Sequence, residues 1–430
     1  MESRREFLKV SAAAAVVSQS ILGANDRVQM GIIGTGVRGN QVQEAFVRNK
    51  DMQFVAACDV AKSKLDKFAS KLGGSLATYG DYRRLLENKD VEAVLITTPD
   101  HWHSPIMVAA CEAGKDVYCE KPVSNAIEPA LKMIAAARKY NRVVQVGLQQ
   151  RSWPHFQECA RLVREGYIGP INQCMMLFGG MSGFRTPAEK PGPPPADLDW
   201  EMFQGPAPRH AYVPSRQNNW RSYYDYGGGS VTDWGVHLMD IAMWYMDADQ
   251  KQAALTNGMG QYISSPLDPE KSPDTFTVTW KFEKFVATFT NAVPPSQGGN
   301  IMSEQYGNYF FGTRGMLLVN RYGYEIQPVP PIKLPAGMSA NFQLPPQPPP
   351  IEGKKDFDPN GILEDPDSKM GSATVAHTRN FLDCVKSRQH PICDIQIGFN
   401  SSLPCIMANL SIRQGKTFVW DNNAKAARPA

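Results

Sequence analysis

A glycine-rich turn near the start of the chain constrains the fold more than any other feature of the sequence. Residues 28–33 form a short apolar run that predicts a buried strand, and residues 40–49 predict a helix. Between them, Gly34, Gly36 and Gly39 form a Gly-x-Gly-x-x-Gly pattern. The first glycine makes a tight turn, the second admits a pyrophosphate close to the backbone, and the third packs helix on strand. We therefore expect a dinucleotide site, with a flavodoxin-like sheet that binds another ligand as the alternative.

The first third of the chain alternates strands with helices. Further strands are predicted at residues 54–58, 91–97, 116–119 and 142–147. Helices are predicted between them, at residues 62–72, 104–113 and 127–140. Strands separated by helices pair in parallel and are covered on both faces. The sequence therefore predicts an α/β fold that begins with a doubly wound Rossmann domain over residues 27–148.

Beyond about residue 149 the pattern changes. A strand is predicted at residues 171–178, and runs in which Thr, Val and Phe alternate follow at residues 274–282, 285–291 and 308–320. Helices are predicted at residues 156–165, 375–387 and 401–414. Residues 149–430 should therefore form an α+β domain with a large, mostly antiparallel sheet. Two proline-rich excursions, at residues 181–214 and 328–359, either cover an active site or extend a subunit interface.

Composition excludes some classes of partner. The formal net charge is only +3 for 430 residues, and no block of Lys and Arg is present, so we expect no nucleic-acid partner. None of the eight cysteines forms a Cys-x-x-Cys pair, and most lie in apolar runs, which favours buried free thiols. A disulfide between Cys384 and Cys393 is the alternative.

The first 26 residues differ from the rest. Arg4 and Arg5 precede a short, weakly apolar run at residues 10–22, which is the layout of a signal peptide and resembles a twin-arginine export signal. We expect a periplasmic or otherwise exported protein, with an unstructured tail as the alternative. Residues 22–24 are a poor cleavage site, so the cleavage position stays open. No other segment predicts a membrane span.

Asp59 ends the second predicted strand, 20 residues beyond Gly39. A carboxylate at that position accepts hydrogen bonds from the adenosine ribose hydroxyls and repels a 2′-phosphate. NAD is therefore the expected cofactor. NADP remains an alternative because Arg38 is able to reach a 2′-phosphate.

Three further motifs lie at predicted strand ends or helix starts, where open α/β sheets hold ligands. They are Thr-Thr-Pro-Asp-His-Trp-His at residues 97–103, Glu-Lys-Pro at residues 120–122, and Gly-Gly-Gly-Ser-Val-Thr-Asp-Trp-Gly-Val-His at residues 227–237. Together with the glycine turn, they resemble the glucose–fructose oxidoreductase, inositol dehydrogenase and rhizopine-catabolism (Gfo/Idh/MocA) family over about residues 27–320. The resemblance implies an NAD(P)-dependent oxidoreductase that acts on a sugar or polyol, with a homo-oligomer formed through the C-terminal sheet.

The chemistry of three residues fits that expectation. A lysine beside a nicotinamide polarises the oxygen of the reacting alcohol or carbonyl, and Pro122 fixes the backbone of Lys121. Asp233 and His237 lie four apart on a predicted helix and so share a face. The family resemblance implies that Asp233 orients the substrate hydroxyl and that His237 is the acid/base. The alternatives are a solvated surface lysine and a hydrogen bond between Asp233 and His237 on a helix surface.

The predicted site thus falls into three groups. The catalytic residues are Lys121, Asp233 and His237. The cofactor-binding residues are Gly34, Thr35, Gly36, Val37, Arg38, Gly39, Asp59, Thr98, Pro99, His101, His103, Glu120, Lys121 and Gln149. The substrate-binding residues are Lys121, Arg151, Trp220, Asp233 and His237.

Several of these residues have other interpretations. Arg151 is as well suited to a structural salt bridge, and Trp220 to a core that includes Tyr223 and Tyr224. Zinc binding by His101, His103, His237 and Asp240 is not supported by any His/Cys spacing, so no metal is expected.

Three functions remain open. The first is an oxidoreductase that transfers a hydride to or from a secondary hydroxyl of a sugar, cyclitol or glycoside, with a free or a tightly bound, recycled cofactor. The second is a glycoside-cleaving enzyme that oxidises a ring hydroxyl transiently, although such relatives often lack the Glu-Lys-Pro motif kept here. The third, of another class, is a non-catalytic sensor of a sugar or cofactor.

Overall fold

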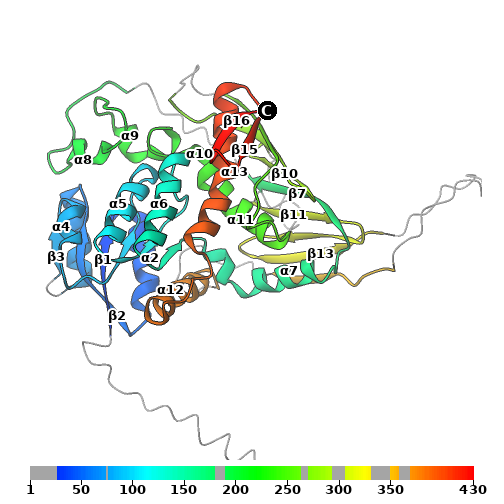
Figure 1. The fold of residues 1–430 in the computed structure, drawn as a ribbon, viewed down its shortest axis with the longest axis horizontal. Coiled ribbons are helices and arrows are strands. Elements are labelled where there is room, and N and C mark those ends of the chain that lie inside the picture. The colour runs from blue at the N-terminus through cyan, green and yellow to red at the C-terminus, as the bar shows by residue number, and fades with distance from the viewer. Residues whose placement is uncertain are drawn as a thin grey trace, which may run out of the picture.

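The computed structural model describes residues 27–73, 76–179, 189–262, 270–292, 306–330, 349–357 and 369–430 (Figure 1). The expected signal at residues 1–26 lies outside these ranges, as do parts of both proline-rich excursions. Figure 1 shows a parallel α/β unit on one side and a broad, mostly antiparallel sheet on the other. The predicted fold class is confirmed.

The α/β unit is built on a parallel sheet with strand order β3-β2-β1-β4-β5-β6. Its strands are β1 (Val28–Ile33), β2 (Met52–Cys58), β3 (Ala77–Tyr79), β4 (Ala93–Ile96), β5 (Asp116–Cys119) and β6 (Val144–Val146). Its helices are α2 (Val37–Val47), α3 (Lys62–Leu72), α4 (Tyr82–Leu86), α5 (Asp100–Glu112) and α6 (Ile127–Lys139). Every residue of β4 and β5 is buried, because helices cover both faces of the sheet.

The second sheet has ten described strands in the order β14-β13-β12-β11-β7-β10-β9-β8-β15-β16. They are β7 (Ile171–Phe178), β8 (Leu255–Gln261), β9 (Thr275–Lys281), β10 (Val286–Thr290), β11 (Tyr306–Gly312), β12 (Gly315–Val319), β13 (Gly323–Pro328), β14 (Lys354–Phe357), β15 (Phe418–Asp421) and β16 (Ala426–Pro429). Among the described pairs, only β7 with β10 is parallel. In β9, Phe276, Val278 and Trp280 are buried while their neighbours are not, so one face of the sheet carries the core.

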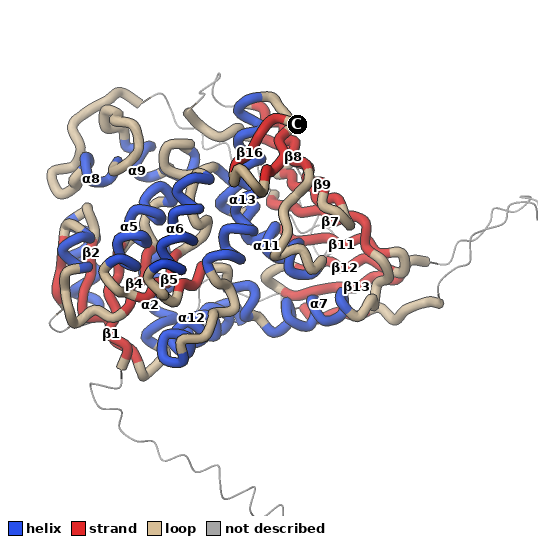
Figure 2. Tube along the Cα trace, viewed as in Figure 1, coloured by secondary structure: helices blue, strands red, loops and turns tan. Residues whose placement is uncertain are grey.

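The helices of the second half lie around both sheets, and α13 and α11 lie between them (Figure 2). The longer ones are α7 (Pro154–Arg164), α11 (Gly235–Tyr245), α12 (Lys369–Ser387) and α13 (Ile395–Gln414). The short ones are η2 (Gln149–Ser152), α8 (Trp200–Gln204), α9 (Pro214–Asn218), η3 (Trp220–Ser222) and α10 (Gly229–Asp233). Helix α13 contacts β8 and α11 on one side and α6 on the other. The Trp280 indole donates to the Pro404 carbonyl at 2.9 Å, which joins β9 to this helix.

Helix α12 returns to the α/β unit from late in the sequence. The Phe381 ring lies edge-on to Phe46 of α2 and to Tyr118 of β5, with centroids 6.0 and 5.9 Å apart. The Asn49 amide donates to the Thr378 hydroxyl at 3.2 Å in the same buried contact. Residues on both sides of the predicted domain boundary at residue 148 therefore pack in one shared core.

The eight cysteines all lie in described ranges, and all are buried free thiols, as the sequence predicted. Burial raises the pKa of the Cys111 thiol to about 12, so this group stays protonated at neutral pH. Within the described ranges, no helix combines the length and apolar character that a membrane span requires.

Candidate active site

The glycine turn adopts a conformation that side chains would block. Gly34 has φ +96°, and a Cβ there would lie 2.8 Å from the Thr97 backbone. A Cβ on Gly39 would lie 2.2 Å from the Gly34 carbonyl oxygen, whereas Gly36 faces open space. No side chain caps the first turn of α2, so its N–H groups are available to a phosphate.

Asp59 hydrogen-bonds to the glycine turn and also lines the cavity beside it. Its carboxylate accepts hydrogen bonds from the Thr35 backbone N–H at 2.7 Å, the Thr35 hydroxyl at 3.0 Å and the Ala61 N–H at 2.9 Å. Thr35 and Gly39 are not on the cavity wall themselves, so their predicted role in cofactor binding is indirect.

A cavity of about 300 Å³ lies over the glycine turn. One side is formed by residues of the α/β unit that the sequence singled out, namely Gly34, Gly36, Val37, Arg38, Asp59, Thr98 and Pro99. The other side comes from residues 197–221, here called the cover segment, and includes Leu198, Met202, Phe203, Gln217, Asn218, Trp220 and Arg221. The cavity is therefore enclosed between the two halves of the chain.

Backbone hydrogen bonds fix the cover segment to the α/β unit. The Lys62 N–H donates to the Asp197 carbonyl at 2.8 Å, and the Asp199 N–H donates to the Val60 carbonyl at 2.9 Å. The Trp102 indole donates to the Phe203 carbonyl at 2.9 Å. Leu198, Met202 and Phe203, from the described part of the first proline-rich excursion, thus line the cavity, and covering a site was one of the two roles expected of this excursion. Figure 1 shows α8 and α9 of the cover segment beside the α/β unit.

A second cavity, of about 230 Å³, adjoins the first. The two share Arg38, Thr97, Thr98, Trp220 and Arg221 on their walls. The second cavity also receives Lys121, Asp233 and His237, together with His103, Glu120 and Gln149. The three predicted catalytic residues, far apart in the sequence, therefore meet in one space beside the glycine turn.

Lys121 and Asp233 form an ion pair inside this cavity. The Lys121 ammonium donates to Asp233 Oδ1 and to the Asp233 carbonyl oxygen, both at 2.7 Å. Burial alone would raise the pKa of Asp233, but the positive charges of Lys121 and Arg221 lower that pKa to about 2. Asp233 is therefore a carboxylate throughout the physiological range, and the Lys121 ammonium keeps one N–H for another acceptor.

His237 does not share a helix with Asp233. Helix α10 ends at Asp233 and α11 begins at Gly235, so the single helix expected across both residues is broken at Trp234. Nδ1 of His237 is buried without a hydrogen-bond partner. Burial, followed by the charges of Lys121 and Arg321, lowers the pKa of His237 well below its usual value. The imidazole is therefore neutral at pH 7 and available as a proton acceptor.

The two histidines of the 97–103 loop have different places. His103 lines the second cavity, and its ring nitrogens lie 2.7 Å from the Pro122 carbonyl oxygen and 2.9 Å from the Thr98 carbonyl oxygen. His101 lines neither cavity, because its Nε2 bonds the Phe203 carbonyl at 3.0 Å behind the wall. The contact of His101 with a cofactor stays a prediction, and the structure places the residue behind the wall of both cavities. In the described ranges, no group of His, Cys, Asp or Glu is arranged to hold a metal.

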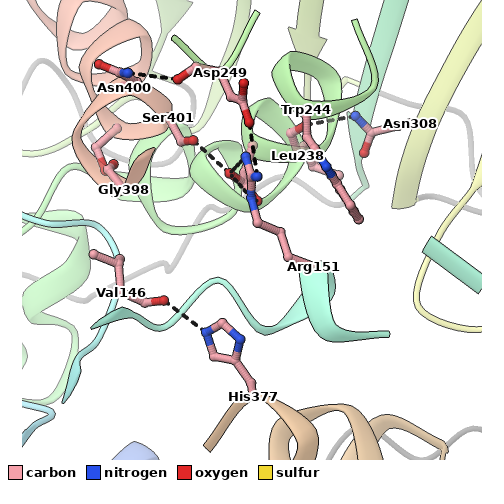
Figure 3. A network of polar contacts seen from close by, with 12 residues as sticks. Val146, Arg151, Leu238, Trp244, Asp249, Asn308, His377, Gly398, Asn400 and Ser401 are labelled. Atoms are coloured by element: carbon pink, nitrogen blue, oxygen red, sulfur yellow. Dashed lines mark hydrogen bonds and ion pairs between the residues drawn. The ribbon is translucent and has the colours of Figure 1, made fainter. Parts of the chain in front are cut away.

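Arg151 forms a structural salt bridge, which was the alternative given for this residue beside substrate binding. Its guanidinium forms a buried ion pair with Asp240 at 2.8 Å and contacts Asp249 at 3.2 Å. The Ser401 hydroxyl also donates to Asp240 at 2.8 Å, and the Trp244 ring lies 5.2 Å from the guanidinium (Figure 3). Arg151 is only 3% exposed and is on the wall of neither cavity.

The sequence did not single out Arg221, Arg321 or Asp100, three titratable residues of the second cavity, as site residues. Arg221 contacts Asp233 at 3.3 Å, and Arg321 lies in the turn between β12 and β13. Neither belongs to a recognisable motif, so the sequence carried no local signal for them. Asp100 lay within a motif that was singled out, and burial raises its pKa well above the usual value. The Asp100 carboxyl is thus protonated where a carboxylate would otherwise be expected.

Two stretches of the chain match models of an oxidoreductase family. Residues 28–148 match the Gfo/Idh/MocA model described as an oxidoreductase family with an NAD-binding Rossmann fold. Residues 184–257 match the model of the C-terminal alpha/beta domain of the same family. The two matches correspond to the two halves that form the cavity walls.

Among curated relatives, the oxidoreductase YrbE of Bacillus subtilis is 28% identical over 236 residues, which are 54% of this chain and 59% of YrbE. Inositol 2-dehydrogenase of Salmonella paratyphi B is 32% identical over 35% of this chain and 45% of that protein. A glycosyl hydrolase family 109 protein of Stenotrophomonas maltophilia is 38% identical over 27% of this chain and 29% of that protein. The chain thus spans less than two thirds of these relatives.

Among solved structures, scyllo-inositol dehydrogenase from Lactobacillus casei, bound to NAD(H) and scyllo-inositol, superposes with a TM-score of 0.62. The match covers 91% of this chain and 98% of that one at 17% identity. The likeness shows that the fold is shared.

Proposed function

We propose that this chain, which matches models of the Gfo/Idh/MocA oxidoreductase family over residues 28–148 and 184–257, transfers a hydride between NAD and a secondary hydroxyl of a sugar, cyclitol or glycoside. The observation that carries the proposal is the meeting of Lys121, Asp233 and His237 in one cavity beside the glycine turn. Oxidation of an alcohol needs a hydride acceptor, a proton acceptor and a group that stabilises charge on the oxygen. The named inositol 2-dehydrogenase among the relatives is consistent with such a substrate.

The residues of the first cavity fit a dinucleotide. The turn has no room for a Cβ at Gly34 or Gly39, it is open at Gly36, and the start of α2 has no side-chain cap. Asp59 also lines this cavity, and its carboxylate disfavours a 2′-phosphate and so favours NAD over NADP. Bound NAD would supply the hydride acceptor.

The chain's own residues would then handle the proton and the oxygen. The free N–H of the Lys121 ammonium is suited to stabilise negative charge on the substrate oxygen. The neutral His237 imidazole is suited to take the hydroxyl proton during oxidation and to return it during reduction. Asp233 fixes the position of Lys121 through two hydrogen bonds and is suited to accept one from a neighbouring substrate hydroxyl.

We also propose that the cofactor stays bound between turnovers. The cover segment closes the first cavity with chain from the second half, and backbone hydrogen bonds fix it in place. Release of a dinucleotide would need those contacts to open. A retained cofactor is recycled when one sugar is oxidised and another is reduced.

The mechanism is tested by Lys121→Met, with Lys132→Met as the matched control. Lys132 lies on the exposed surface of α6, where it pairs with Glu128. Loss of a positioned catalytic group lowers rates by about 100- to 10,000-fold, so kcat of Lys121→Met should fall by at least about 100-fold. NAD affinity, measured by calorimetry, should stay within about threefold. Unchanged turnover in Lys121→Met would exclude the mechanism.

Cofactor retention is tested on the purified protein by mass spectrometry of the released ligand and by turnover without added NAD. A bound dinucleotide and turnover of a sugar pair without NAD are expected. A strict requirement for added NAD would reject retention but leave the hydride-transfer proposal intact.

The second candidate is cleavage of a glycoside through transient oxidation, and the family 109 relative favours it. Such an enzyme would release the leaving group of a nitrophenyl glycoside with no net formation of reduced NAD. Net reduced NAD in proportion to oxidised sugar would favour the simple dehydrogenase. Sugar binding without either signal across a broad panel would favour a sensor.

We further propose export through the twin-arginine route, on the strength of Arg4, Arg5 and the following apolar run. A folded, cofactor-loaded protein suits that route. Replacing both arginines by lysine should retain the protein in the cytoplasm, as cell fractionation would detect. A periplasmic location in the double variant would contradict the assignment. We also propose a homo-oligomer. Light scattering should then give a molar mass that is a multiple of the 47.6 kDa of one chain.

A further inference from the structure

Arg321 is a cation of the second cavity that the proposed chemistry does not use. It lies in the turn between β12 and β13 and lines the second cavity but not the cofactor cavity. Its guanidinium lies over the Trp234 ring, 4.9 Å from the centroid, and 5.7 Å from the Tyr306 centroid. Its Nε is 3.4 Å from the Gln150 amide oxygen. Aromatic rings hold the guanidinium plane and leave its in-plane N–H groups for a ligand.

The other charges of this cavity are matched within the protein. Glu120 pairs with Arg38 at 2.8 Å, and Asp233 pairs with Lys121 at 2.7 Å and with Arg221 at 3.3 Å. In the ranges that the structure describes, no carboxylate lies within 4.0 Å of the Arg321 guanidinium. Asp100 also lines the cavity, but burial raises the pKa of its carboxyl and keeps it neutral. Two carboxylates, Glu120 and Asp233, thus face four cations, and the cavity is positively charged.

The position of each cation indicates whether it would face the cofactor or the substrate. Arg38 and Arg221 line both cavities, so they face the junction where a dinucleotide would carry its negative phosphates. Arg321 lines only the second cavity, together with Lys121 and His237. A bound cofactor therefore leaves Arg321 as the cation that still lacks an anion.

We propose that the substrate is a sugar acid whose carboxylate binds Arg321 while a ring hydroxyl faces Lys121 and His237. This inference rests on the proposed function and names its substrate class. A guanidinium matches a carboxylate with two parallel N–H···O bonds. One unmatched positive charge suits a singly charged carboxylate better than a phosphate, which carries roughly two negative charges.

The test compares matched pairs of sugars that differ only in the anionic group, namely D-glucuronate with D-glucose and D-galacturonate with D-galactose. The quantity measured is the ratio of kcat/KM for the acid to kcat/KM for the neutral sugar. A charge-assisted, two-bond contact makes this ratio at least about 10 in the wild type, and Arg321→Gln should lower it by about 10- to 100-fold. The ratio should also fall as salt concentration rises.

Arg161→Gln is the matched control, because it removes an arginine from the exposed face of α7. Its ratio should equal that of the wild type. Arg321→Lys keeps the positive charge but not the two parallel N–H donors of a guanidinium. Its ratio of kcat/KM values should therefore lie between those of the wild type and Arg321→Gln. If Arg321→Gln fails to fold, the comparison of Arg321→Lys with the wild type carries the test. An equal ratio in those two proteins would then count against the proposal.

Binding gives a readout that does not depend on turnover. D-glucuronate should raise the melting temperature of the NAD-saturated wild type more than D-glucose does, and Arg321→Gln should abolish that difference. Turnover of neutral sugars with a ratio that Arg321→Gln leaves unchanged would overturn the sugar-acid assignment while the proposed function stands. Binding of glucuronate through Arg321 without any hydride transfer would instead overturn the proposed function. A preference for D-glucose 6-phosphate over glucuronate would overturn the choice of a carboxylate.

Discussion

His377 makes the stability of this protein sensitive to mild acid. It lies on α12 with no exposed surface, between β6 and η2. Its Nε2 is 3.0 Å from the Val146 carbonyl oxygen, which can only accept, so Nε2 carries the proton. Nδ1 then accepts from the Ser152 hydroxyl at 2.8 Å, and Figure 3 shows the contact of His377 with Val146. The neutral ring is fully bonded in this tautomer, and burial lowers the pKa of His377 to about 4.

The sign and the size of the effect follow from linkage. The unfolded chain has a histidine pKa of about 6.5, so below that pH the unfolded state binds a proton that the folded state does not. The stability contributed by neutral His377 is therefore complete above about pH 6.5 and is lost as the pH falls towards the folded pKa of about 4. Between about pH 7.5 and pH 5 the loss from this residue amounts to about 2 kcal/mol.

The assay is urea unfolding at both pH values and constant ionic strength, for the wild type and His377→Gln. The free energy of unfolding of the wild type should fall by about 2 kcal/mol more than that of His377→Gln between the higher and the lower pH. Gln145→Ala is the matched control, because the Gln145 amide donates to the His377 carbonyl at 2.8 Å between the same elements without titrating. Gln145→Ala should be less stable than the wild type, and the difference in free energy of unfolding should be similar at both pH values. Equal acid losses in the wild type and His377→Gln would refute the reasoning.

Three further predictions concern other parts of the molecule. Gly39→Ala should raise the Kd for NAD at least about tenfold in a calorimetric titration, because its Cβ would lie 2.2 Å from the Gly34 carbonyl oxygen; an unchanged Kd would contradict the packing. Arg151→Met should cost about 3–5 kcal/mol in chemical unfolding, since Asp240 would be left buried and unpaired, and a loss below 1 kcal/mol would mean that the network does not support the fold. Leu198→Asp should speed the loss of NAD on dialysis by disturbing the cover segment, and retention equal to the wild type would argue against that segment as a barrier.

Local patterns predicted the elements well where one apolar run corresponds to one element. The strands at residues 116–119 and 171–178 and the helix at residues 62–72 have the predicted bounds. The run at residues 308–320 was predicted only as part of an antiparallel sheet, and in the structure it contains a hairpin. It turns at Thr313 and Arg314 between β11 and β12. Because apolar residues continue on both sides of this short turn, hydrophobicity alone did not reveal it.

The site was predictable where motifs mark it, and not where partners are distant. The structure brings Lys121, Asp233 and His237 into one cavity, as their motifs indicated, while their chemical roles stay predictions. The salt bridge of Arg151 was one of two predicted alternatives, but its partner was not predicted, because Asp240 lies 89 residues away and no local pattern records such a pair. Arg321 was missed for the same reason, since its place beside Trp234 depends on how the second sheet is folded.

The return of α12 to the α/β unit means that the N-terminal residues do not form a finished domain by themselves. Phe381, Leu382 and Cys384 belong to the same apolar cluster as Val28, Met30 and Phe46. During synthesis, this apolar cluster cannot be completed until residues 381–384 have been made, near the end of the chain. A gene divided after residue 148 would therefore yield a first fragment with an uncovered apolar face, and its solubility should depend on supplying the second fragment at the same time.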